Sequence, residues 1–288
     1  MPFPAGGPTD LMARLAGRWL SSSVGQSVII ENLSGAGGTS GSRVVARANP
    51  DGYMLLLGGT NSNAITSALY KNLTYDPVRD FAPVASIAVD SSALVVTPAV
   101  PAKTIQEFIQ HLKRNPGSLT MGAPVGIAPH AMVAFFTIKS GTDMVFVPYR
   151  GAAPLIVDLL GNQIQMTIGA KSTYLPHIQE GKLRALAVTS DSRWPELPDV
   201  PTMSESGFVG FPSYLWFELL APAKTPAAIV DKLNAAINSG LRSSEIQASL
   251  AKLGVEPRIQ TPQELQKLLL DEAQQWDTIV KSTGIKLD

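Results

Sequence analysis

The sequence predicts an α/β protein, in which strands and helices alternate along the chain. Short apolar or β-branched runs are bounded by Gly and Pro, and segments with helical spacing of apolar residues lie between them. The loops that join the two kinds of segment are short. Because strands joined by helices usually lie parallel, we expect parallel sheets, with ligands at the loops that follow the strands' carboxyl ends.

Length and composition are those of a globular protein of one or two domains. The 288 residues are 45% hydrophobic and 16% charged, and the formal net charge is zero. A zero net charge gives no reason to propose a nucleic-acid or membrane-surface partner. There are no cysteines, which excludes disulfides and thiol chemistry.

No apolar run approaches the roughly 20 residues that span a bilayer. Met1 stands directly before Pro2-Phe3 and a glycine loop, so the chain shows no signal peptide. A strand normally precedes such a loop. We therefore expect the native product to carry a leader and more of a first strand.

The stretch Pro4-Ala-Gly-Gly-Pro-Thr-Asp10 is a loop that leads into a helix. Gly6 and Gly7 allow close approach of the backbone, Pro8 suits the first helical position, and Thr9 or Asp10 can cap nearby donors. Apolar residues at helical spacing follow, and Gly25 ends the helix. This helix start is a candidate anion site. The alternative is an ordinary capped helix whose glycines only make a turn.

Strands are predicted where β-branched and apolar residues cluster. They lie at residues 27–31, 53–57, 93–97, 119–122, 144–147, 165–168, 183–188 and 215–220. The loops at 4–10, 35–41, 58–63 and 123–130 are rich in glycine or hydroxyl residues. We expect all of these loops at the carboxyl ends of strands, where ligands usually bind.

Helices are predicted between these strands from apolar residues at helical spacing. They lie at residues 11–24, 42–48, 65–69, 104–112, 131–138, 153–160, 175–179, 229–237, 246–253 and 261–279. Capping boxes, Thr104-Ile-Gln-Glu107 and Thr261-Pro-Gln-Glu264, mark the starts of two of them.

Proline-rich segments at Pro98-Ala-Val-Pro101 and Ala221-Pro-Ala-Lys-Thr-Pro226 suggest that the chain crosses twice between two α/β lobes. Residues 1–98 and 220–288 would form lobe 1, and residues 99–219 lobe 2. This is the layout of a hinged clamp with a ligand cleft between its lobes. The alternative is one continuous three-layer domain with prolines in ordinary loops.

Several segments resemble the Bug family, the extracytoplasmic solute receptors of tripartite tricarboxylate transporters. Each motif is weak alone, but the series spans essentially the whole chain in the same order and spacing. The segments are Pro2-Phe-Pro-Ala-Gly-Gly-Pro-Thr-Asp10, Glu31-Asn-Leu-Ser-Gly-Ala-Gly-Gly38, Pro50-Asp-Gly-Tyr-Met-Leu-Leu-Leu57, Tyr75-Asp-Pro-Val-Arg-Asp-Phe-Ala-Pro-Val84, Val147-Pro-Tyr-Arg-Gly-Ala-Ala-Pro154, Leu159-Leu-Gly-Asn-Gln163, Leu175-Pro-His-Ile178, Gly181-Lys-Leu-Arg-Ala-Leu-Ala-Val-Thr189 and Leu197-Pro-Asp-Val-Pro-Thr202.

The resemblance implies a periplasmic binding protein of type II-like fold that has no catalytic activity. It implies that the loops matching Pro4–Asp10 and Gly122–His130 hold the carboxylate of a small organic acid, mono- or dicarboxylate, through backbone groups and waters. Side chains of Thr60–Asn63 and of residues 169–173 would recognise the rest of the ligand. The candidate ligand-binding residues are Ala5, Gly6, Gly7, Thr9, Asp10, Thr60, Asn61, Ser62, Asn63, Gly126, Ile127, Ala128, His130, Lys171, Ser172 and Trp216.

Two departures from the family pattern bear on specificity. Ile127 and Ala128 stand where the family commonly carries hydroxyl residues before Pro-His, so we expect a drier, more apolar side of the pocket. Near residue 170, where the family often carries an acid or amide, this chain has Gly169-Ala-Lys-Ser172. Lys171 is a candidate partner for a second ligand carboxylate. Its alternative is a solvated surface lysine.

No metal or cofactor site is expected. His111, His130 and His177 lack metal-ligand spacing, and neither a P-loop nor a nucleophile elbow occurs. For His130, the alternative to a role in the ligand pocket is a structural role. Asp51 and Asp76, like Asp10, are candidate caps of turns or helices, and no paired carboxylates with a mechanism stand out. Trp216 and Phe217 either pack at the lobe junction or form an aromatic wall of the cleft.

The expected partners are an organic carboxylate and the membrane components of a tripartite tricarboxylate transporter, with the receptor a monomer. One alternative is an α/β enzyme for a small carboxylic acid, with His130 or Lys171 as proton carrier. Another is a binding protein that serves a sensor.

Overall fold

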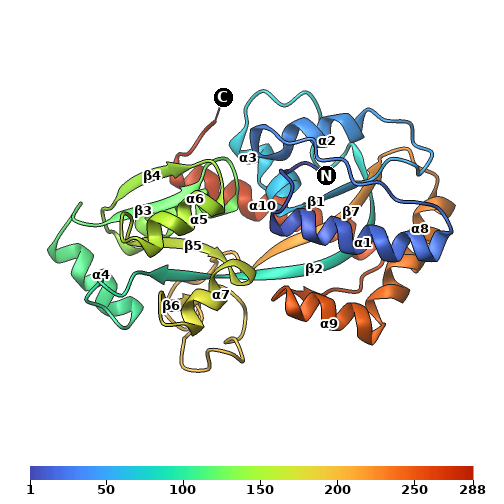
Figure 1. The fold of residues 1–288 in the computed structure, drawn as a ribbon. Coiled ribbons are helices and arrows are strands. Elements are labelled where there is room, and N and C mark those ends of the chain that lie inside the picture. The colour runs from blue at the N-terminus through green and yellow to red at the C-terminus, as the bar shows by residue number, and fades with distance from the viewer. Residues whose placement is uncertain (288) are drawn as a thin grey trace. The chain divides into compact units, whose positions relative to one another are not determined.

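The computed structural model describes residues 1–287, which fold into two compact units (Figure 1). The first unit contains Met1–Val89 and Leu215–Lys281, and the second contains Asp90–Tyr214. A short C-terminal piece, Ser282–Gly284, belongs to the second unit, and the chain from Ile285 returns to the first. The chain thus changes unit within strands β2 (Phe81–Val96) and β7 (Tyr214–Pro222), and again near the end of the last helix, α10 (Pro262–Thr283).

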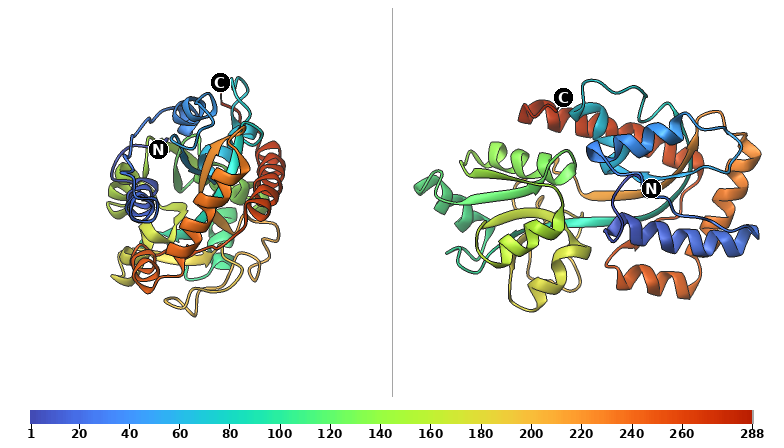
Figure 2. Two further views of the ribbon diagram at one scale, coloured as in Figure 1. Left: turned by 90° about the vertical axis from the view of Figure 1, so that its right-hand side faces the viewer. Right: turned by 45° about the horizontal axis from the view of Figure 1, so that its top comes forward.

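The first unit contains helices on both faces of a sheet. Its elements are α1 (Pro8–Val24), η1 (Ala36–Gly38), α2 (Thr39–Ala46), β1 (Leu56–Gly59), η2 (Thr60–Ala64), α3 (Thr66–Leu69), the first part of β2 (Phe81–Val96), β7 (Tyr214–Pro222), α8 (Ala227–Leu241), α9 (Ser244–Lys252), β8 (Glu256–Pro257) and α10 (Pro262–Thr283). Strand β1 pairs with β7 in antiparallel register, with Leu56 opposite Leu220, and β8 pairs with β2. Figure 2 gives two further views of these helices.

Alternation along the strands gives each face of this sheet its own core. On one face, Leu57, Phe217 and Leu219 pack with apolar residues of α1 and α8, such as Trp19 and Ile237. On the other face, the core consists of Val45, Leu56, Tyr75, Val78, Phe81, Leu220, Leu265 and Leu269. The second face is therefore covered by α10 and α2.

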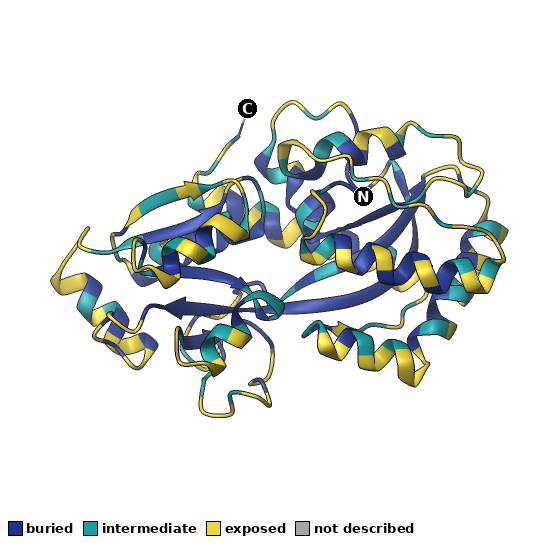
Figure 3. Cartoon of the chain, viewed as in Figure 1, coloured by how far each residue is buried: buried dark blue, intermediate teal, exposed yellow. Residues whose placement is uncertain are grey.

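The second unit is a mixed sheet with helices. Its elements are the second part of β2, α4 (Ile105–Arg114), β3 (Thr120–Pro124), α5 (Ala128–Ser140), β4 (Val145–Tyr149), α6 (Ala152–Leu160), β5 (Met166–Ala170), α7 (Lys171–Gln179) and β6 (Arg184–Val188). Strand β3 pairs in parallel with β4 and β5, whereas β2 pairs in antiparallel register with β5 and β6. Figure 3 shows that β2, β3, β5 and β6 are largely buried, that β4 is partly exposed, and that the helices expose one side.

The α/β class and the helices expected from spacing are confirmed. Both capping boxes form, since Glu107 N–H donates to Thr104 Oγ1 and Glu264 N–H donates to Thr261 Oγ1. Gly25 ends α1 with φ of 69°, a left-handed conformation that glycine adopts without strain. Asp51 and Asp76 accept hydrogen bonds from the backbone N–H groups of Tyr53 and Val78, as expected of turn caps.

Three expectations were wrong. Residues 27–31 are extended but pair with no strand, because their apolar side chains pack on the side of α1 instead. The loop at 35–41 therefore does not follow a strand. The sheets are mixed rather than purely parallel, since strand direction depends on partners far along the chain. Finally, β2 begins at Phe81 rather than Ala93, because burial overrides the weak strand preference of Asp90-Ser-Ser92.

Candidate functional site

The loop before α1 is held in place by the buried carboxylate of Asp10. Its Oδ2 atom accepts from Gly6 N–H and from Arg14 Nε, each at 2.9 Å, and its Oδ1 atom accepts from Asn32 Nδ2 at 2.9 Å. Asp10 is 2% exposed. Burial opposes ionisation, but the donors from Gly6, Asn32 and Arg14 outweigh it and lower the pKa of Asp10 to about 2. At neutral pH, Asp10 is thus ionised, and its carboxylate fixes the conformation of this loop.

The start of α1 presents backbone donors. Gly7 is the N-cap residue and supplies no side chain, and Pro8 follows with no N–H of its own. The first intrahelical bond runs from Leu11 N–H to the Gly7 carbonyl, so the N–H groups of Thr9 and Asp10 have no intrahelical acceptor. The partial positive charge of this helix end favours an anion. Ala5 and Gly6 are exposed, whereas Gly7 and Thr9 are half-buried.

The second glycine loop packs between the first loop and the residues after β1. A Cβ atom at Gly38 would meet Phe3 and Ser62 side chains at 3.1 and 3.0 Å. Asn32 also donates to the Phe3 carbonyl at 3.1 Å. The first unit therefore brings three of the expected loops together, although the loop at 35–41 serves as packing.

The Thr60–Asn63 loop forms one wide turn, η2, directly after β1. The side chains of Thr60, Ser62 and Asn63 are fully buried and bonded within the unit. Asn63 Nδ2 donates to the Pro77 carbonyl at 2.9 Å, and Ser62 Oγ donates to Asn63 Oδ1 at 2.8 Å. Asn61 is partly exposed. The roles of these four residues in ligand recognition stay predictions.

Thr60 connects this loop to β7 and α10. Its Oγ1 atom accepts from Trp216 N–H at 3.0 Å and donates to Glu272 Oε2 at 3.0 Å. Gly59 is required at the strand end, because φ is 142° and a Cβ atom would fall on the Trp216 carbonyl oxygen. Trp216 itself is half-buried. The hydrogen bond between Trp216 and Thr60 therefore involves the backbone N–H of Trp216 and not its ring.

Sequence reasoning missed a pair of buried acids behind this loop. Glu218 is fully buried and Glu272 is 7% exposed, and the charge of Glu218 is one of the causes that raise the pKa of Glu272. A signal was present for both. Glu218 interrupts an apolar strand, and Glu272 lies three residues after Leu269 and four before Trp276, on the buried face of its helix.

In the second unit, the loop after β3 leads into α5. Gly126 has φ of 83°, and the N-cap residue Ile127 supplies no side-chain cap. Ala128 is fully buried and Ile127 half-buried. His130 stacks on Phe146, with ring centroids 4.9 Å apart, and burial lowers its pKa. Within residues 1–287 its Nδ1 atom has no hydrogen-bond partner. His130 is therefore a neutral, half-buried imidazole at neutral pH.

Lys171 and Ser172 begin α7, immediately after β5. Lys171 is 8% exposed, which rules out the solvated surface lysine. Its Nζ atom lies 2.9 Å from Glu196 Oε2 and 5.3 Å from the centre of the Trp194 ring. Ser172 Oγ donates to the buried Asp90 carboxyl at 2.5 Å. Because β3 and β5 are parallel, this cluster and the Gly126–His130 loop lie at the same edge of the sheet.

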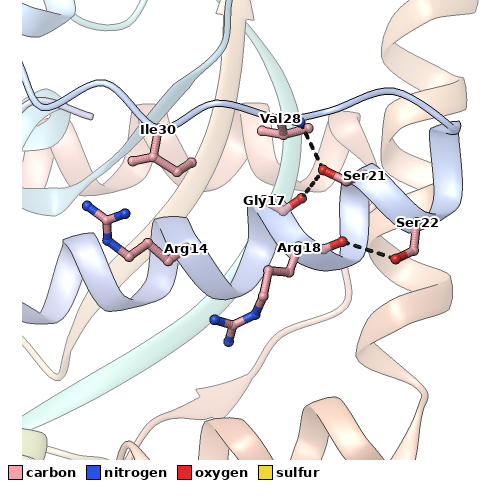
Figure 4. A pocket seen from close by; sticks show the side chains of 7 residues that line it. All are labelled: Arg14, Gly17, Arg18, Ser21, Ser22, Val28 and Ile30. Atoms are coloured by element: carbon pink, nitrogen blue, oxygen red, sulfur yellow. Dashed lines mark hydrogen bonds between the residues drawn. The ribbon is translucent and has the colours of Figure 1, made fainter.

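A shallow groove runs along the flank of α1 (Figure 4). Its lining consists of Arg14, Gly17, Arg18, Ser21, Ser22, Val28 and Ile30. Ser21 joins the two sides, since its hydroxyl accepts from Val28 N–H and donates to the Gly17 carbonyl. None of the expected ligand residues is among the described residues that line this groove, and Arg14 links it to the loop through Asp10.

No helix within residues 1–287 combines the length and apolar character needed to cross a membrane. The expected pairing of Lys171 with a ligand and the expected contacts of Ala5, Gly6, Gly7 and Thr9 stay predictions. Asp10 and Ser172 have protein partners, as described above.

Comparison with known proteins places the chain in a family. Residues 12–285 match the family model TctC, described as "Tripartite tricarboxylate transporter family receptor". BugT of Bordetella pertussis is 35% identical, over 100% of this chain and 89% of BugT. These matches confirm the receptor class and the periplasmic location expected from the sequence.

Solved structures agree. An R. palustris protein with adipate is 34% identical with a TM-score of 0.90, covering 99% of this chain and 96% of that one. MatC from Rhodopseudomonas palustris with bound malate is 33% identical with a TM-score of 0.86, covering 97% and 96%. The fold expected from the sequence, that of periplasmic binding proteins, is confirmed. The chain belongs to the tripartite tricarboxylate transporter receptors, among which are the Bug proteins.

Proposed function

We propose that this receptor binds a small organic carboxylate at the start of α1 and passes it, unchanged, to the membrane components of a tripartite transporter. One observation carries the proposal: Asp10 fixes a glycine loop around a helix start whose N–H groups at Thr9 and Asp10 lack intrahelical acceptors. Adipate and malate, bound by structural neighbours, are both carboxylates. In this proposal the protein binds and releases the carboxylate without changing it chemically.

The helix start alone does not account for tight binding. A helix N-terminus contributes about 0.3–1 kcal/mol toward an anion, or about 2 when partly buried, and each hydrogen bond to a charged group adds about 1.5–3 kcal/mol. Micromolar affinity needs about 8 kcal/mol after the costs of association. We therefore propose that the second unit contributes the remaining contacts, with closure of both lobes over the ligand.

The second unit favours an apolar ligand body. Ile127 and Ala128 present no hydroxyl at the start of α5, and His130 is neutral. For a dicarboxylate, we propose Lys171 as the partner of the far carboxylate. Its ammonium group has three donors, and Glu196 accepts one of them.

A ligand screen tests the proposal. Native mass spectrometry and thermal shift with aliphatic mono- and dicarboxylic acids, adipate and malate included, should reveal acids that raise the melting temperature, because a ligand that binds only the folded chain stabilises it. The matching amides are the control, and they should give no shift. Recovery of the unchanged acid after incubation distinguishes a receptor from an enzyme. A shift that is equal for acids and amides, or turnover of the acid, would contradict the proposal.

The oligomeric state belongs to the same proposal. We expect a monomer, as for a receptor that delivers its ligand by docking. Sedimentation with and without the best ligand from the screen checks this expectation.

A further inference from the structure

Glu218 is an acid inside a sheet core. It lies on β7, opposite Gly58 of β1. Strand alternation places it on the same face as Leu220, whereas Phe217 and Leu219 face the other side. That face is the one covered by α10. Glu218 is fully buried, and within the described chain neither of its carboxyl oxygens has a hydrogen-bond partner.

Glu272 approaches the same face from α10. Its neighbours along the helix, Leu269 and Trp276, are fully buried, and its Oε2 atom accepts the hydroxyl of Thr60 at 3.0 Å. Thr60 begins the loop that is the candidate for ligand recognition. Hydrogen bonds from Trp216 N–H to the Thr60 hydroxyl, and from that hydroxyl to the Glu272 carboxyl, thus link Glu272 directly to that loop.

A buried carboxylate without a donor or cation carries a large desolvation cost, and such groups stay protonated instead. Burial raises the pKa of Glu218 to about 8, and burial together with the Glu218 charge raises that of Glu272 well above its usual range. Two such acids titrate as a coupled pair.

The surrounding elements place no compensating charge beside the pair within the described residues. In the segment between α3 and β2, Lys71 and Arg79 are exposed, and Asp76 and Asp80 accept from backbone N–H groups of that segment. Strand β1, the loop 60–64 and residues 81–89 contain no titratable side chain, and β7 contains only Tyr214 besides Glu218. Tyr75 lies in the same core, with its pKa raised to about 12 by burial. Tyr70 is half-buried, and the Arg43 side chain of α2 is exposed. On α10 itself, Lys267 pairs with Asp271 on the exposed side.

We propose that Glu218 and Glu272 form a proton-holding pair behind the Thr60–Asn63 loop, which makes capture of an anionic ligand depend on the pair being neutral. The inference rests on the proposed function and deepens it. Ionisation of Glu218 or Glu272 would place negative charge behind a loop that must accept a carboxylate. Ionisation of Glu272 would also change the charge on the group that accepts the Thr60 hydroxyl. By linkage, the ligand and the protons bind cooperatively.

The pH dependence of ligand affinity tests this pair. We expect the dissociation constant for the best acid of the screen, measured by calorimetry, to be flat from pH 6 to 7 and to rise up to tenfold per pH unit above pH 8. At pH 8, titrations in phosphate and in Tris should differ in heat, because the protein takes up protons as it binds.

Matched variants locate the effect. Glu218→Gln with Glu272→Gln keeps shape and neutrality, so the double variant should bind at pH 6 like the wild type and lose the rise above pH 8. Asp271→Asn removes a charge from the exposed side of the same helix and should keep the wild-type profile. Each single variant should reduce the rise. Should the double variant not fold, the single variants and the buffer comparison on the wild type decide.

The outcomes separate the two proposals. Binding that is tight and independent of pH from 6 to 9, with equal heats in both buffers, overturns the proton-holding pair and leaves the carboxylate receptor standing. A rise in dissociation constant that persists in the double variant also overturns it. Absence of binding by any acid at any pH overturns the proposed function, and the pair's role with it.

Discussion

Asp10 illustrates how a residue can build an anion site without contacting the anion. Its carboxylate accepts hydrogen bonds from Gly6, Arg14 and Asn32. The backbone N–H groups of Thr9 and Asp10, at the start of α1, keep no intrahelical acceptor. A negative charge close to an anion site is unfavourable by itself. Arg14 and the Asn32 amide compensate it, which is consistent with its lowered pKa.

Replacing Asp10 by Asn should lower the free energy of unfolding by about 2 kcal/mol at pH 7, because the amide cannot reproduce the ion pair and all its acceptor bonds. The folded pKa of Asp10 lies below its unfolded value, so the carboxylate stabilises the fold above pH 3.8 and this contribution disappears as pH falls toward 2. Urea unfolding at pH 7 and pH 3 measures the difference. Asp51→Asn, in an exposed turn, should change stability by less than about 0.5 kcal/mol. Equal losses for both variants would show that Asp10 is an ordinary cap.

Lys171 is the second residue whose role is decided by its neighbours. Lys171→Met keeps the stem against Trp194 and removes the charge. If Lys171 binds the far carboxylate, the variant should lose at least about tenfold in affinity for a diacid, which corresponds to about 1.4 kcal/mol, and little for the matching monoacid. Calorimetry with adipate and hexanoate measures both. Equal changes for the two acids would confine Lys171 to its pair with Glu196.

At the scale of elements, the close pairing of β1 with β7 fixes the candidate loop. Gly59→Ala would force a Cβ atom onto the Trp216 carbonyl, in a backbone conformation that side chains rarely adopt. We expect the free energy of unfolding to fall by more than about 3 kcal/mol. The hydrogen bond from Trp216 N–H to Thr60 should be lost as well.

Gly151→Ala is the control for this variant. A Cβ atom at Gly151 meets nothing within 4 Å, and its φ of 177° is extended backbone. Stability should change by less than about 1 kcal/mol. A Gly59→Ala protein as stable as Gly151→Ala would contradict the strand register described for β1 and β7.

Local patterns predicted the elements that local interactions form. The capping boxes at Thr104 and Thr261 and the stripe from Met12 to Leu20 are such cases, since each signal lies within one turn or one helix. Strand β2 could not be predicted over its full length, because its polar residues bond to groups far along the chain. The Asp90 carboxyl accepts from Ser172, the Ser91 hydroxyl accepts from Trp194, and the Ser92 backbone N–H donates to Thr189.

The candidate site also has parts that local sequence patterns predict and parts that depend on residues far apart in the chain. The glycine loop and helix start at Pro4–Asp10 are local and were predictable, and the family motifs added the loops at 60–63 and 126–130. The Glu218 and Glu272 pair is not local, since 54 positions separate the two residues. Likewise, nothing near Lys171 in the sequence indicates that Glu196 is its partner.

For the whole molecule, the buried acids predict a fold whose stability falls as pH rises from about 4.5 to about 8. The raised folded pKa of Glu218 means that its neutral form is compatible with the fold at acid pH, and that stability falls as pH rises from the unfolded value of 4.5 toward about 8. The slope is about 1.4 kcal/mol per pH unit for each such group. Unfolding in urea at pH 5, 6, 7 and 8 should therefore show a steeper decline for wild type than for Glu218→Gln. Parallel curves would mean that Glu218 ionises freely in the folded chain.

The whole account depends on where an organic acid binds. A crystal structure of the receptor with the acid that gives the largest thermal shift is the most direct measurement. We predict a ligand carboxylate within hydrogen-bond distance of the N–H groups of Thr9 and Asp10, with the Asp10 contacts to Gly6 and Arg14 intact. A structure in which protein atoms occupy that helix start, while the acid lies elsewhere, would contradict the account.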